Sequence, residues 1–305
     1  MQNAIRHLNE ALHEAAEKHA AGYGEREIRN IIDLLLDELC GISRTDRILC
    51  PDRTLTADQS RQLLAISDQL RRGIPVQQAM GYAWFGGVRF SVNSDVLIPR
   101  PETEELVDWI VSTLLVAPSP RILDVGTGSG CIALSLARRI PSAQVVAADV
   151  SEAALRVAID NSYQQGVENV QFIQCDILTV NDECFSQQVI NNAVNTCQQL
   201  STSTFDVIVS NPPYICNHEA SEMTPTVLDH EPSLALFVPD EDPLLFYRTI
   251  AQYAVRHLAH GGYLFFEINA AYGRETVALL QSLGFSDIQL RQDVSGRDRM
   301  IRATL

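Results

Sequence analysis

The residues Asn211, Pro212, Pro213 and Tyr214 have the chemistry to hold a planar amino group. They follow an apolar, β-branched segment, residues 205–210, which is typical of a buried parallel strand. Neither proline has an N–H, and Pro213 disfavours a helical Pro212, so the carbonyls of this turn have fixed directions and no strand partners. The Asn211 side-chain oxygen and the Pro212 carbonyl could therefore accept both hydrogens of an NH2 group. Tyr214 is expected to lie against the flat face of its carrier.

This NPPY turn (residues 211–214) suits attack by a poor nitrogen nucleophile. The nitrogen lone pair of an amide, or of an exocyclic base amine, is delocalised. Holding both N–H bonds returns electron density to nitrogen and fixes its direction of attack, which is catalysis by positioning and electrostatics. Asn211, Pro212 and Tyr214 are the candidate catalytic residues, and all four residues are candidate substrate contacts. An ordinary Asn-Pro turn after a strand is the alternative that these four residues leave open.

A second candidate site is a glycine-rich turn between a predicted strand and a predicted helix, formed by Gly126, Thr127, Gly128, Ser129 and Gly130. Glycines let the backbone approach a ligand closely at the carboxyl edge of such a sheet. Asp149 ends the next predicted strand, at a spacing suited to an acid that binds a ribose. Two alternatives compete with a nucleoside site of this kind. The G-x-G-x-x-A match at residues 128–133 would suit a nicotinamide dinucleotide, and a tight turn without a ligand would leave Asp149 as a helix cap.

Regular alternation of strands and helices from residue 121 onward must position these residues. It predicts a doubly wound parallel sheet with helices on both faces. The carboxyl ends of its first, second and fourth strands lie on one edge, so the glycine turn, Asp149 and Asn211 should converge there. The last two strands are too close in sequence for a crossover helix and should pair antiparallel. The seven expected strands cover residues 121–126, 144–150, 170–176, 205–210, 261–269, 288–294 and 300–305.

The expected domain organisation has three parts. Residues 1–73 show helical periodicity and predict a helical bundle, with partner recognition or plain stabilisation as its role. Residues 74–99 contain a Gly-Gly turn between alternating segments and predict a β-hairpin linker. Residues 100–305 are expected to form the α/β domain. The composition of its polar segment 180–204 predicts a surface insertion.

Composition excludes several classes of function. There is no apolar run long enough to span a membrane and no secretory signal pattern, so a cytoplasmic protein is expected. The seven cysteines form no C-x-x-C pair, and neither a metal site nor a disulfide framework is expected. Of the net charge of −15, −13 falls in residues 76–305, which disfavours direct binding of a nucleic-acid backbone.

Five segments together resemble the bacterial release-factor glutamine N5-methyltransferases, which use S-adenosylmethionine. They are LIPRPETEELV (97–107), ILDVGTGSGCIALSLA (122–137), SNPPYI (210–215), HEPSLALF (230–237) and GRDRMI (296–301). NPPY alone is shared with adenine and guanine amino-methyltransferases, whereas the full set is much more specific. The resemblance implies an α/β class I methyltransferase fold, a seven-stranded sheet whose last strands are antiparallel, with a small N-terminal helical domain.

By the same resemblance, the enzyme would methylate the side-chain amide of the glutamine in the Gly-Gly-Gln motif of peptide chain release factors and form S-adenosylhomocysteine. Residues 126–130, Asp149 and Asn211 would hold S-adenosylmethionine, and residues 211–214 would hold the glutamine. Arg100, Glu102 and Thr103 resemble supporting contacts at the catalytic face. The pair Glu231-Pro232 would border the substrate or simply form a turn.

The sequence departs from the family pattern at Ile177. An aromatic residue often follows the acid that ends the third strand in this family, and it packs on the adenine. Ile177 could supply apolar contact there but not ring stacking. Three other functions compete with the release-factor hypothesis: a nucleic-acid adenine N6 or guanine N2 methyltransferase, a non-catalytic S-adenosylmethionine-binding module and a dinucleotide oxidoreductase.

Overall fold

The computed structural model describes residues 1–18, 23–50, 52–114, 118–179 and 204–305. The chain divides into two compact units, one of residues 1–82 with 222–231, the other of residues 83–221 with 232–305. The predicted insertion at 180–204 lies outside the described residues, apart from Thr204. Within the described residues, no helix has both the length and the apolar character needed to cross a bilayer.

The first unit is a group of helices around an apolar core. Ser43 and Thr56 begin two of them with capping boxes, in which each hydroxyl accepts a backbone N–H three residues later. Leu8, Leu35 and Leu63 are fully buried where the apolar faces of three helices meet. The helices of this unit are α1 (Gln2–Lys18), α2 (Glu25–Cys40), α3 (Arg44–Leu49), α4 (Ala57–Arg71), α5 (Val76–Met80) and α9 (Pro225–His230).

Helix α9 joins this unit from a distant part of the sequence. The side-chain amide of Gln78 donates a 2.9 Å hydrogen bond to the carbonyl of His230, across 152 residues. Helix α9 is too short for an apolar periodicity that would predict its packing in the first unit. The first unit therefore includes residues that the sequence assigned to the α/β domain.

A hairpin connects the two units along the chain. It consists of β1 (Tyr82–Phe85) and β2 (Val88–Ser91). Its turn residues Gly86 and Gly87 have φ of 55° and 74°, and the left-handed region that both occupy is open to glycine at low cost.

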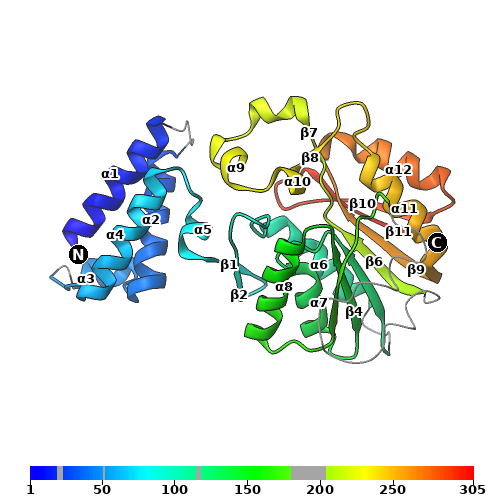
Figure 1. Ribbon diagram of the computed structural model, residues 1–305, viewed down its shortest axis with the longest axis horizontal. Helices are drawn as coiled ribbons and strands as arrows, with labels where there is room; N and C mark the ends of the chain where they lie inside the picture. The colour runs from blue at the N-terminus through cyan, green and yellow to red at the C-terminus, as the bar shows by residue number, and fades with distance from the viewer. Residues whose placement is uncertain (19–22, 51, 115–117, 180–203) are drawn as a thin grey trace. The chain divides into compact units, whose positions relative to one another are not determined.

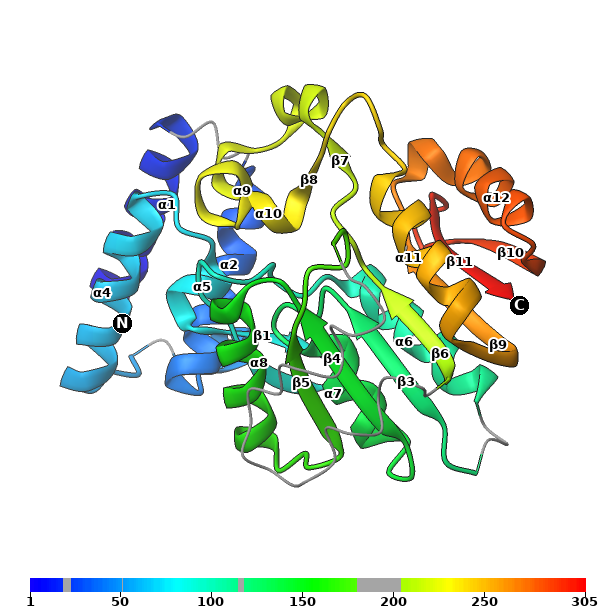
Figure 2. The same cartoon turned by 45° about the vertical axis from the view of Figure 1, so that its right-hand side comes forward.

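The second unit contains a seven-stranded sheet of order β10-β11-β9-β6-β3-β4-β5. β3, β4, β5, β6 and β9 are parallel, and β10 and β11 pair antiparallel, so the predicted fold is confirmed. Figure 2 shows the arrows of β6, β3 and β4 side by side and pointing the same way. The strands are β3 (Arg121–Val125), β4 (Gln144–Asp149), β5 (Val170–Gln174), β6 (Phe205–Ser210), β9 (Leu258–Glu267), β10 (Ser286–Gln292) and β11 (Asp298–Thr304).

Each face of this sheet has its own apolar core, because successive strand side chains point to opposite faces. Ile122 and Val207 pack with α6 (Pro101–Thr113), α7 (Cys131–Arg139) and α8 (Glu152–Gln165). Leu123 and Ile208 pack with α11 (Leu245–His257) and α12 (Gly273–Ser282) on the other face. The two groups of helices are separate in the ribbon (Figure 1).

Short elements follow β6 that the sequence did not predict. They are β7 (Ile215–Cys216), η3 (Asn217–Glu222), α10 (Ser233–Leu236) and β8 (Phe237–Val238). β7 and β8 pair in parallel as a separate two-stranded sheet. Such short segments have no measurable periodicity, since two strand residues make a single alternation.

Candidate active site at the carboxyl edge of the sheet

A cavity of about 240 Å³ lies where β3, β4 and β6 end. Its lining brings together most of the residues selected from the sequence: Gly126, Thr127, Gly128, Ser129, Asp149, Ile177, Asn211, Pro212 and Pro213. Arg100 and Thr103 line it as well. Four other described residues that were selected from the sequence do not line it: Glu102, Gly130, Tyr214 and Glu231.

The glycine-rich turn leaves open space beside its backbone. Gly126 and Gly128 have φ of 76° and 55°, and a Cβ added at either would meet no atom within 4 Å. Gly130 differs, because an added Cβ would lie 3.1 Å from side-chain atoms of Leu134 and Ala158. Gly130 therefore serves close packing of α7 against α8, while the first two glycines border the cavity.

Asp149 fixes the shape of the glycine-rich turn from the end of β4. Its Oδ2 accepts a 2.8 Å hydrogen bond from the Gly128 N–H, and its Oδ1 accepts one of 2.9 Å from the Ser151 N–H. Burial raises the pKa of the Asp149 carboxyl, and these backbone donors oppose the rise. A carboxylate oxygen has two lone pairs, so each still has capacity for a ligand hydroxyl.

Asp124 supports the same turn from beneath. Its buried Oδ2 accepts hydrogen bonds from the Thr127 hydroxyl at 2.7 Å and from the Ala133 N–H at 3.2 Å. Its Oδ1 is buried without a hydrogen-bond partner in the described part of the chain. Burial raises the pKa of Asp124 to about 7, and the nearby charge of Asp149 adds to the rise.

A chain of hydrogen bonds orients Asn211. The Asn211 Nδ2 donates to the Thr103 hydroxyl at 3.4 Å, and that hydroxyl donates to Oε2 of Glu267 at 2.6 Å. Oδ1 is the acceptor of the Asn211 amide, and the bond from Nδ2 to Thr103 leaves Oδ1 available to a ligand. The Ser210 hydroxyl donates a 2.6 Å bond to the Val125 carbonyl and ties the end of β6 to β3.

Tyr214 supports the turn from inside the protein. Its ring packs against the apolar core that contains α11, and its hydroxyl donates a 3.2 Å hydrogen bond to Oε1 of Glu267. Burial raises the pKa of this hydroxyl well above its ordinary value, and the charge of Glu267 adds to the rise. The Asn269 side chain also donates to the Tyr214 carbonyl at 3.0 Å. Tyr214 is not among the described residues that line the cavity.

Glu267 is a buried carboxylate that sequence reasoning missed. It ends β9, and only the three-dimensional fold brings it to Thr103 and Tyr214. Burial raises its pKa, whereas its hydrogen bond from Thr103 lowers it. The only sequence signal is an acid at the end of an apolar strand, which is where such folds place functional residues.

The remaining selected residues have distinct positions. Arg100 is the N-cap of α6 and Ile177 is a buried apolar residue at the cavity wall. Glu231 is the buried C-cap of α9, and Pro232 lines the cavity. Glu102 is in the first turn of α6 and does not line the cavity.

The order of the sheet and the glycine-rich turn after β3 define a class I methyltransferase fold. Residues 118–238 match the family model described as "Methyltransferase domain", and residues 10–81 match "PrmC N-terminal domain". The chain is also similar in fold to the solved catalytic domain of hMettl16, with a TM-score of 0.53 and 15% identity over 82% of this chain and 83% of that one.

Curated relatives give the family. The chain is 43% identical to the release factor glutamine methyltransferase of Flavobacterium psychrophilum, over 93% of this chain and 94% of the relative. It is 40% identical to that of Bacteroides thetaiotaomicron, over 92% and 94%. The chain belongs to the release factor glutamine methyltransferase family.

Proposed function

We propose that this protein transfers a methyl group from S-adenosylmethionine to the side-chain amide nitrogen of the glutamine in the Gly-Gly-Gln motif of peptide chain release factors. The observation that carries the proposal is the convergence of the glycine-rich turn, Asp149 and the NPPY turn on one cavity. The names of the relatives support the substrate. The reaction belongs in the cytoplasm, where translation termination takes place.

The residues around the cavity fit S-adenosylmethionine. Gly126 and Gly128 offer open backbone, and Asp149 offers carboxylate oxygens for ribose hydroxyls. Ile177 supplies an apolar wall for the adenine. When bound, the cofactor supplies an electrophilic methyl group. The chemistry of the site requires no metal for this transfer.

The NPPY turn would position the accepting nitrogen. Asn211 Oδ1 and the Pro212 carbonyl would each accept a hydrogen bond from the NH2 group of the glutamine. Thr103 would keep the Asn211 amide from rotating. Holding the nitrogen in this way directs its lone pair toward the methyl group. Its extra proton becomes acidic as the new N–C bond forms, so water can remove it without a dedicated base. Tyr214 would act by fixing the turn rather than by touching the glutamine.

The first unit would recognise the release factor. Its match to a family-specific N-terminal model supports this role, as do the exposed apolar side chains of Ile48 and Leu49, which are 74% and 72% accessible on α3. Exposed apolar groups of this size are common in partner-binding surfaces.

The direct test is an assay on unmethylated release factor incubated with this protein and S-adenosylmethionine. Intact mass and peptide mapping should find one added methyl on the Gly-Gly-Gln glutamine. Parallel reactions contain duplex DNA or ribosomal RNA with a labelled methyl donor. Label in nucleic acid, with none in the release factor, would overturn the proposal and favour an amino-methyltransferase acting on adenine or guanine.

A further inference from the structure

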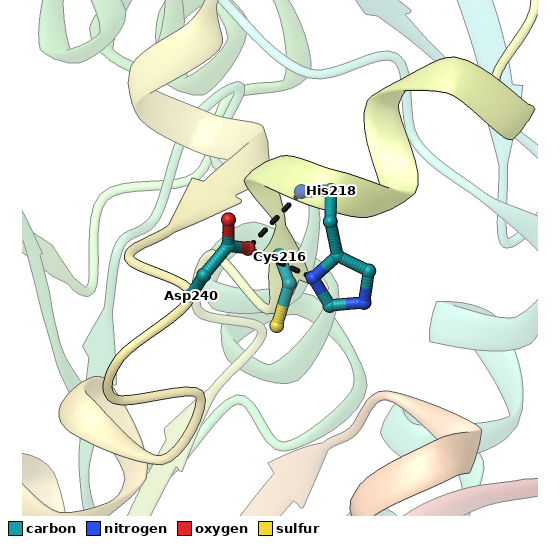
Figure 3. Close-up of side chains that lie close together, drawn as sticks. All are labelled: Cys216, His218 and Asp240. Atoms are coloured by element: carbon teal, nitrogen blue, oxygen red, sulfur yellow. Dashed lines mark hydrogen bonds and ion pairs between the residues drawn. The ribbon is translucent and has the colours of Figure 1, made fainter.

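Cys216, His218 and Asp240 bring sulfur, nitrogen and oxygen donors together outside the cavity. One donor atom from each lies within 4.8 Å of the other two. The His218 Nδ1 is 2.9 Å from Oδ1 of Asp240. Figure 3 shows the imidazole and the carboxylate facing each other, with the Cys216 sulfur beside them. The proposed methyl transfer uses none of these three side chains, and the Cys216 sulfur lies 3.5 Å from the Tyr272 hydroxyl.

The backbone holds the three residues in place. Cys216 and Val238 are partners in the β7–β8 pairing, and Asp240 follows Val238 by two residues. Asp240 Oδ1 also accepts a 3.0 Å hydrogen bond from the His218 backbone N–H. The segments that carry the donors are therefore linked both by strand pairing and by this bond.

One of the three residues is buried and the other two are accessible to solvent. Cys216 is fully buried, whereas the side chains of His218 and Asp240 are 62% and 42% exposed. A buried sulfur beside two accessible donors leaves an entry path for an ion from solvent. Glu219 adds negative charge nearby, since its Oε2 accepts the Cys216 N–H at 2.7 Å.

We propose that Cys216, His218 and Asp240 form a binding site for a divalent transition-metal ion, with zinc as the ion that this ligand set suits best. Thiolate, imidazole and carboxylate are the three side-chain ligands of zinc in proteins. Ligand atoms around tetrahedral zinc lie roughly 3.3 to 3.7 Å apart, given metal–ligand distances of about 2.0 to 2.3 Å. Side-chain rotations would bring the three atoms to that spacing, with water as the fourth ligand.

Binding would release a proton. The ion would replace the thiol proton of Cys216, while His218 would bind through Nδ1 as a neutral imidazole with its N–H at Nε2. Burial raises the pKa of the Cys216 thiol, and the carboxylates of Glu219 and Asp240 add to the rise. The metal must therefore displace the thiol proton, which passes to solvent, while the same carboxylates attract the cation.

The proposed site lies next to the NPPY turn in sequence, because Cys216 follows Tyr214 by two residues. A bound ion would cross-link β7 to the chain after β8 and stabilise that segment. The sequence predicted no metal site because its cysteines form no C-x-x-C pair. The cluster instead combines a C-x-H pair with an acid 22 residues further on.

The test uses the full-length protein, stripped of metal with a chelator and then dialysed. Titration with zinc followed by calorimetry should give one site per chain, and titration with cobalt should give the absorption band of a cobalt–thiolate bond. In H218A and D240N the affinity for zinc should fall about 10- to 100-fold or more, as expected when a metal site loses a ligand or its support. In C216S the cobalt–thiolate band should disappear.

Matched controls come from the same chain. His13 lies 3.0 Å from Glu25, an exposed His–acid pair without a cysteine, and Cys50 is an exposed free thiol. H13A and C50S should bind metal like the wild type. No binding by the wild type, or a cobalt–thiolate band that persists in C216S, would overturn the proposal. If C216S does not fold, the zinc affinity of H218A is the test, because this substitution changes an exposed residue. Zinc affinity equal to that of the wild type in H218A would also overturn the proposal.

Discussion

The Thr103 hydroxyl donates a 2.6 Å hydrogen bond to Oε2 of Glu267, across 164 residues of sequence. It joins the first turn of α6 to the end of β9, and both residues are buried. The same hydroxyl accepts the Asn211 side-chain N–H, and Glu267 also accepts the Tyr214 hydroxyl. One buried carboxylate thus reaches the NPPY turn at both ends.

The first prediction concerns Thr103. T103V keeps the shape of the side chain and removes the hydroxyl, so the Asn211 amide loses the bond that orients it. Loss of one such bond costs about 1 to 2 kcal/mol, so turnover on the release factor should fall roughly tenfold. T103S keeps the hydroxyl and should retain near-normal turnover. A folded T103V enzyme with full turnover would show that the Asn211 orientation does not depend on Thr103.

The second prediction concerns Asn211 itself. N211A removes an acceptor proposed to hold the reacting nitrogen, and turnover should fall about 10²-fold or more, by analogy with loss of one group from an oxyanion hole. Affinity for S-adenosylmethionine should fall less, because the glycine-rich turn and Asp149 remain. Steady-state kinetics and calorimetry measure the two effects separately. Turnover close to wild type would contradict the role proposed for the NPPY turn.

The parts of the fold that sequence predicted are those with strong local periodicity. Apolar strand segments such as residues 205–210 alternate regularly with helical segments. This alternation predicts a doubly wound sheet. Its topology then requires Asp149 and Asn211 to meet at one edge. For that reason most of the residues selected from the sequence line the cavity.

The contacts that sequence could not predict depend on tertiary packing. Tyr214 turns inward because Glu267 and an apolar core receive it, and nothing in residues 211–214 specifies that partner. Gly130 allows close contact between α7 and α8, because an added Cβ would lie 3.1 Å from side-chain atoms of Leu134 and Ala158. Residues 215–238 form elements too short for a periodic signal, and α9 packs with a unit encoded mostly at the other end of the chain.

The third prediction separates cofactor binding from catalysis. D149A removes the carboxylate proposed to bind ribose hydroxyls and also the acceptor of the Gly128 N–H. Affinity for S-adenosylmethionine, measured by calorimetry, should fall about 10- to 100-fold, as for hydrogen bonds to a charged group. D160A changes an exposed acid of α8 and serves as the control. Equal affinities in D149A and D160A would mean that the ribose binds elsewhere.

The fourth prediction tests partner recognition by the first unit. I48E places a charge on an exposed apolar position of α3, and KM for the intact release factor should rise about fivefold or more, as for an interface residue worth over 1 kcal/mol. KM for a short Gly-Gly-Gln peptide should not change. V294E, at a residue that is 90% exposed in the other unit, is the control. An equal rise for peptide and protein, or none for either, would argue against recognition by α3.

The fifth prediction concerns the buried carboxyl of Asp124. Its pKa of about 7 in the folded protein lies above the ordinary value of an unfolded aspartate, so the folded state binds the proton more tightly. The stability that this protonation provides is full below about pH 4 and is lost as the pH rises through about 7. Asn is neutral throughout, so the free energy of unfolding of D124N should fall less than that of the wild type across this range.

Denaturant titrations of both proteins between about pH 4.5 and pH 7.5 measure this difference. Part of the decline should remain in D124N, because burial also raises the pKa of Asp149 and Glu267. D160N, at an exposed position, should follow the wild-type curve. Parallel curves for D124N and the wild type would mean that Asp124 does not take up a proton in this range. The glycine-rich turn would then rest on a buried carboxylate that keeps its charge.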